Sequence, residues 1–187
     1  NCLGAYKMTL PPFHSDEIWR SYNNLRPRCK TTYKQALSNA VDTCIAQSVK
    51  SPRILVLGAG PGTYDVSVLL EVLDERCTKL VGSSITAVDW ETRAEASAAA
   101  AKSRVKVEFL EKDIEHFLAN ADQGSFDIVV AFLVVHHLAN WRLAMANITR
   151  VASGGSLVFD EYTDAGWLEW IDGSTGFVGL DPQLPQT

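Results

Sequence analysis

Apolar residues recur along the chain with two different spacings. Five short apolar or alternating runs are typical of β-strands: residues 53–58, 85–89, 105–109, 126–131 and 156–160. Between these runs the apolar residues return every three or four positions, which predicts helices. Strands that alternate with helices predict an α/β fold, in which a doubly wound, mostly parallel sheet carries helices on both faces.

Helical spacing also precedes the first strand. Ser15 is a suitable N-cap for a helix that stops near Pro27, and a second helix follows and ends at Ser51-Pro52. We therefore divide the chain into a helical N-terminal extension, residues 1–52, and an α/β core, residues 53–187.

A glycine turn joins the first strand to the helix that follows it, through Gly58, Gly60 and Gly62. Glycines let the backbone turn sharply and let a ligand approach closely, and open α/β sheets bind ligands at the carboxyl ends of their strands. The dinucleotide pattern G-x-G-x-x-G would need a glycine at Thr63, which disfavours an NAD-dependent oxidoreductase. No Gly-Lys-Ser/Thr follows, so a phosphate-binding P-loop is excluded.

Composition narrows the choice of partners. No apolar stretch reaches the roughly 18 residues of a membrane span, and no signal peptide is visible, so we expect a cytoplasmic protein without a membrane partner. The net charge of -5 argues against a nucleic-acid partner. The four cysteines lack the spacing of zinc ligands, and we expect no metal site.

Residues 53–160 resemble the class I S-adenosylmethionine-dependent methyltransferases. The G-x-G-x-G spacing of Gly58, Gly60 and Gly62 is similar to the motif with which that family holds the methionine part of the cofactor. Residues 126–138 resemble its F-D-x-V run followed by H-x-L. The resemblance implies a Rossmann-like fold and methyl transfer from S-adenosyl-L-methionine to an acceptor, with residues 1–52 lying over the cofactor or the substrate.

The resemblance also implies roles for residues at the ends of the later strands. Asp89 would accept hydrogen bonds from both ribose hydroxyls of the cofactor, and Trp90 would pack on its adenine ring. Asp113 would accept from the adenine amino group, while the backbone of Ile114 and of Ala131 would also face the cofactor. Both aspartates can equally be helix N-caps.

Two histidines, His136 and His137, follow the fourth strand and are the candidates for a catalytic base. Imidazole titrates near neutral pH, so either could take a proton from the acceptor. The alternative is that they pack against the following helix or cap it. The acceptor, a small molecule or a protein, and the oligomeric state are left open.

Two departures from the family pattern keep a second function open. Val56 stands where the family often has an acidic residue, and Tyr22, Arg26 and Asp65 are the possible substitutes. Only residues 161–187 follow the fifth strand, although the family has two more strands there, so we expect a truncated chain or a missing sheet edge. The alternative function is a catalytically silent methyltransferase-like domain that serves as a binding module or scaffold.

Overall fold

Five parallel strands form the centre of the part of the chain that the computed structural model describes, residues 30–60, 65–89 and 103–160. The strands are β1 (Arg53–Leu57), β2 (Ser84–Asp89), β3 (Lys106–Glu111), β4 (Ile128–Phe132) and β5 (Ser156–Asp160). They lie in the order β3-β2-β1-β4-β5, and every neighbouring pair is parallel. The strand order therefore reverses between β1 and β4: β2 and β3 lie on one side of β1, and β4 and β5 lie on the other side.

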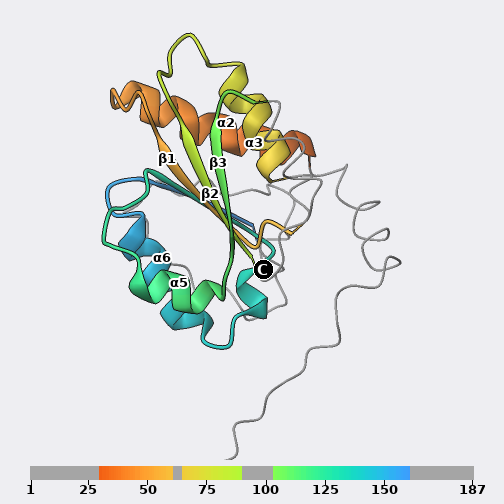
Figure 1. The fold of residues 1–187 in the computed structure, drawn as a ribbon, viewed down its shortest axis with the longest axis vertical. Coiled ribbons are helices and arrows are strands. Elements are labelled where there is room, and N and C mark those ends of the chain that lie inside the picture. Colours follow the sequence, from red (N-terminus) through yellow and green to blue (C-terminus); the bar gives the residue numbers. More distant parts are fainter. Residues whose placement is uncertain (1–29, 61–64, 90–102, 161–187) are drawn as a thin grey trace, which may run out of the picture.

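Helices cover both faces of the sheet (Figure 1). One face carries α2 (Lys30–Ala46) and α3 (Val66–Asp74), and the other carries α5 (Ile114–Asn120) and α6 (Trp141–Val151). A short 3-10 helix, η2 (Val135–His137), lies between β4 and α6. The doubly wound α/β fold predicted from the sequence is confirmed. The helices expected before residue 30 and over 91–101 fall outside the described residues.

Alternation of side chains along the strands explains the continuous apolar runs. Ile54 and Val56 of β1 pack under α2 and α3, whereas Leu55 and Leu57 pack over α5 and α6. A central parallel strand is buried on both sides, so every position along it is apolar. The outer strand β3 instead alternates exposed and half-buried residues, as its sequence predicted.

Strand and helix boundaries differ slightly from those predicted. The second helix ends at Ala46, and Ser48 then takes a left-handed conformation with φ 64°. The loop between α3 and β2 begins with turns that extend α3, and the Val81 N–H donates to the Lys50 carbonyl over 2.8 Å. The loop thus returns to the amino end of β1, and β2 starts beside it.

A cluster at the amino ends of β1 and β4 connects these two strands. Asp127 accepts hydrogen bonds from the Arg53 backbone N–H over 2.8 Å and from the Arg53 guanidinium over 2.9 Å. A Cβ on Gly155 would lie 2.4 Å from the Asp127 carbonyl oxygen, so the chain entering β5 passes too close for any side chain. This cluster explains why an aspartate and a glycine stand at these two positions.

Burial raises the pKa of the Asp127 carboxyl, but the hydrogen bonds from Arg53 outweigh that effect and hold the pKa below its ordinary 3.8. We expect Asp127→Asn to lower the free energy of unfolding by about 1–3 kcal/mol at pH 7. Below pH 3.8 the Asp127 carboxyl is protonated in the unfolded chain before it is protonated in the folded protein. The stability that the charged carboxylate gives the wild type is therefore lost as the pH falls through the folded-state pKa. Urea unfolding of the wild type and of Asp127→Asn at pH 7 and pH 3 measures the difference between their free energies of unfolding. A difference that does not shrink at the lower pH would contradict the assignment.

Candidate active site

The glycine turn lies at the carboxyl end of β1, beside the point where the strand order reverses. Gly58 has φ 66° and Gly60 has φ 51°, both in the left-handed region that favours glycine. A Cβ on Gly58 would lie 2.4 Å from Cγ2 of Val134, which follows β4. Glycine is therefore required at Gly58 for two reasons, its conformation and the approach of β4. Gly62 lies outside the described residues.

Asp89 stands at the end of β2 and turns toward the glycine turn. Its Oδ2 accepts a hydrogen bond from the Gly60 N–H over 2.5 Å. The carboxylate is half-buried, and a carboxylate offers about four acceptor positions. Although residues 77–84 lengthen the connection, β2 pairs with β1 up to Val88, which places Asp89 beside the turn. Trp90, its neighbour, is outside the described residues.

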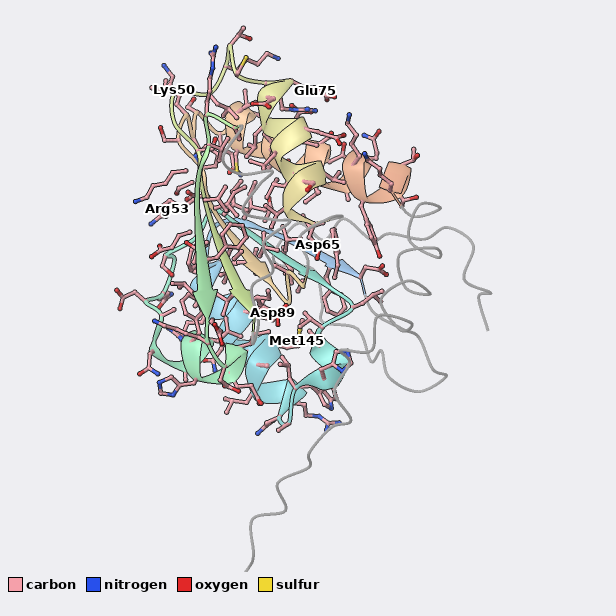
Figure 2. All side chains as sticks on the ribbon, turned by 45° about the vertical axis from the view of Figure 1, so that its right-hand side comes forward. Lys50, Arg53, Asp65, Glu75, Asp89 and Met145 are labelled. Atoms are coloured by element: carbon pink, nitrogen blue, oxygen red, sulfur yellow. The ribbon has the colours of Figure 1, made fainter. Side chains whose placement is uncertain are left out.

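Asp65 follows the glycine turn at the N-cap of α3 and is buried, with 1% of its surface exposed. Figure 2 shows Asp65 and Asp89 toward one end of the sheet and Lys50 and Glu75 toward the other. Val56, in contrast, is fully buried in the apolar core below α2 and α3. Of the possible substitutes for the acid missing at Val56, Asp65 is the one that the structure describes.

Asp113 follows β3 and caps α5. Its carboxylate accepts from the His116 N–H over 2.7 Å, and the residue is exposed. The N-cap interpretation of Asp113 is therefore confirmed, while its predicted contact with a cofactor remains a prediction. Ile114 begins the helix and is buried, and the predicted contact of its backbone with a cofactor remains a prediction.

The chain leaves β4 through a strained residue. Ala131 and Phe132 are buried at the end of the strand, and Leu133 then adopts φ 51°, which is rare for a residue with a side chain. The Leu133 N–H donates to the Asp160 carbonyl over 2.7 Å, which holds this conformation. His136 and His137 lie in η2, directly beyond the turn, and His137 is exposed. Backbone strain of this kind gathers at functional sites.

Sequence reasoning missed one polar pair at this end of the sheet. The Tyr33 hydroxyl donates to Oδ2 of Asp160 over 2.6 Å, and the Tyr33 ring stacks on Phe132 with centroids 4.2 Å apart and planes at 11°. Tyr33 fits the apolar spacing of its helix, and 127 positions separate it from Asp160. No local pattern could have joined them.

The structure thus gathers most predicted site residues at one edge. The ends of β1, β2, β3 and β4 bring Gly58, Gly60, Asp89, Asp113 and Ala131 to the carboxyl edge of the sheet. Among the described residues no group of His, Cys, Asp and Glu could hold a metal ion, and no helix there is long and apolar enough to cross a membrane. Positions of this kind are where open α/β sheets bind ligands.

Comparison with known families settles the class of this fold. The sequence model of a methyltransferase domain matches residues 55–159, which is more than half of the chain. The chain belongs to this methyltransferase-domain family. The match begins in β1 and ends in β5, so it includes residues of all five described strands of the methyltransferase domain. The resemblance seen in the sequence is thereby confirmed. No curated protein sequence matches the chain.

Solved structures share the fold of this methyltransferase domain. The plantazolicin methyltransferase BpumL in complex with SAH is 19% identical, with a TM-score of 0.54 over 79% of this chain and 54% of its own. The Burkholderia thailandensis 1,6-didemethyltoxoflavin-N1-methyltransferase, with bound 1,6-didemethyltoxoflavin and S-adenosylhomocysteine, is 21% identical, with a TM-score of 0.51 over 80% of this chain and 61% of its own. This chain therefore spans less than two thirds of the length of either protein.

We expect Gly58→Ala to destabilise the domain by about 2–4 kcal/mol, because it adds a Cβ against Val134 and places alanine at a positive φ. Combining it with Val134→Ala should remove the clash but not the backbone strain, so the double variant should lose less than the sum of the two single losses. Urea unfolding of all four proteins measures the coupling. Strictly additive losses would mean that the contact does not constrain the turn.

Proposed function

We propose that this chain binds S-adenosyl-L-methionine and transfers its methyl group to an acceptor. The observation that carries the proposal is the hydrogen bond between Asp89 and the Gly60 N–H, which joins an acidic strand end to a glycine turn. Membership of the methyltransferase-domain family supports the reaction, and two proteins of the same fold were solved with bound SAH or S-adenosylhomocysteine.

The residues present fit this cofactor. Gly58 and Gly60 take the left-handed conformations that turn the backbone at the end of β1, and Gly62 continues that pattern in the sequence. A carboxylate such as Asp89 can accept hydrogen bonds from the two ribose hydroxyls. In this proposal Trp90, Asp113 and Ile114 surround the adenine, the backbone at Ala131 faces the cofactor, and residues 1–52 cover the site.

In methyl transfer the main task of the protein is to align the acceptor with the cofactor. The sulfonium group supplies an activated methyl group, so the site has to hold the acceptor in line with the methyl carbon and the sulfur. His136 and His137, in the turn after β4, are proposed to take the proton of the acceptor where it must be lost. The acceptor is a small molecule or a protein of a kind that the family alone does not specify.

Binding of S-adenosylhomocysteine is the first expected result. Calorimetric titration of the purified chain should show saturable binding, whereas NADH should give none. Asp89→Asn should weaken the binding by about tenfold or more, because a charge-assisted bond to the ribose is lost. Asp127→Asn is the matched control, since that carboxylate also accepts a backbone N–H but lies at the opposite end of β4. A folded chain that binds neither compound would favour the scaffold alternative.

Replacing each histidine by alanine tests their role in proton transfer. With an acceptor found by screening, His136→Ala or His137→Ala should lower turnover by about 100-fold or more while S-adenosylhomocysteine binding stays unchanged. Stopped or continuous assays with labelled cofactor measure turnover, and calorimetry measures binding. Full turnover in both variants would remove the histidines from the reaction.

A further inference from the structure

The pair formed by Tyr33 and Asp160 lies on the far side of the glycine turn from Asp89. Asp89 ends β2 and Asp160 ends β5, and β1 and β4 lie between them. At about 4.8 Å for each of three strand spacings, the two strand ends are about 14 Å apart. A ligand bound where the strand order reverses, between β1 and β4, therefore has one acid on either side.

A series of contacts at the end of β4 connects Asp160 to the glycine turn. The Asp160 carbonyl accepts from the Leu133 N–H, and Leu133 is followed by Val134, whose side chain abuts Gly58. Phe132 is paired with Asp160 in the sheet and carries the Tyr33 ring on its face. The position of the Asp160 carboxylate is thus set by the same strand end that shapes the turn.

Tyr33 also fixes the orientation of this carboxylate. Its ring is held by the stack on Phe132, only 2% of the residue is exposed, and its hydroxyl gives Asp160 a short charge-assisted hydrogen bond. A carboxylate has about four acceptor positions, and the bond from Tyr33 occupies one of them and orients the group. Asp160 itself is half-buried at the strand end.

We infer that Asp160 binds the methyl acceptor, and that Tyr33 is the positioning residue that orients it. This inference rests on the proposed function, in which Asp89 takes the ribose and Asp113 the adenine, so that the other end of the cofactor extends toward β4 and β5. A carboxylate there attracts a nucleophile that carries an N–H or O–H, or a positive charge, and holds it by a charge-assisted hydrogen bond. The acceptor class is therefore an amine or a hydroxyl compound rather than a thioether or a carboxylate.

A cofactor analogue tests this without knowledge of the acceptor. Sinefungin carries a protonated primary amine where S-adenosylmethionine has its methyl group, so its amine projects toward the acceptor side. Calorimetry on the full chain compares sinefungin with S-adenosylhomocysteine. Asp160→Asn should weaken sinefungin by about tenfold while S-adenosylhomocysteine changes by less than about threefold. Tyr33→Phe, which keeps the carboxylate but not its orientation, should weaken sinefungin by about threefold.

Asp42→Asn is the matched control, because it removes the same charge from α2 at a surface ion pair with Arg76. It should leave both affinities unchanged. An unchanged ratio of the two affinities in Asp160→Asn overturns the inference, while continued binding of S-adenosylhomocysteine upholds the proposed function. If Asp160→Asn does not fold, the ratio in Tyr33→Phe decides in the same way. A folded wild-type chain that binds neither compound overturns both.

Discussion

The approach of Val134 to Gly58 is the constraint on which the rest of this edge depends. A Cβ at Gly58 would lie 2.4 Å from the valine, so the two strand ends can come this close only because residue 58 has no side chain. The ends of β1 and β4 therefore lie close together, at the place where the strand order reverses. The turn that follows β1 contacts the end of β2, because the Gly60 N–H donates to the Asp89 carboxylate. Leu133, which follows β4, donates its N–H to the Asp160 carbonyl at the end of β5.

Polar contacts far from this edge keep the same strands in register. Arg53 and Asp127 join the amino ends of β1 and β4. Arg150, near the end of α6, donates through its guanidinium to the Leu118 carbonyl over 2.6 Å and also reaches Ala121. These carbonyls close the end of α5, so that one side chain supplies the C-terminal cap of the neighbouring helix. Asp127 and Arg150 therefore stabilise the scaffold.

Prediction from the sequence succeeded where the pattern is local. The five strands, the described helices between them and the glycine turn followed from apolar spacing and from Gly58, Gly60 and Thr63, because strand burial and turn geometry act on adjacent residues. The N-cap alternative for Asp113 was also visible. The pair of Tyr33 and Asp160 was not, since its partners come from the first described helix and the last strand. Nor does spacing along the chain reveal the left-handed Leu133, whose conformation is held by a neighbouring strand.

The distance along the chain between Tyr33 and Asp160 has a consequence for synthesis on the ribosome. As soon as α3 has emerged, α2 can pack against it through Lys30 with Glu71 and Lys34 with Glu75. The hydroxyl of Tyr33, however, finds its carboxylate only after residue 160 has left the exit tunnel and β5 has joined the sheet. Contacts that close long loops form late in folding. A nascent chain therefore completes β1, β2, β3 and β4 before β5 can bring Asp160 to Tyr33.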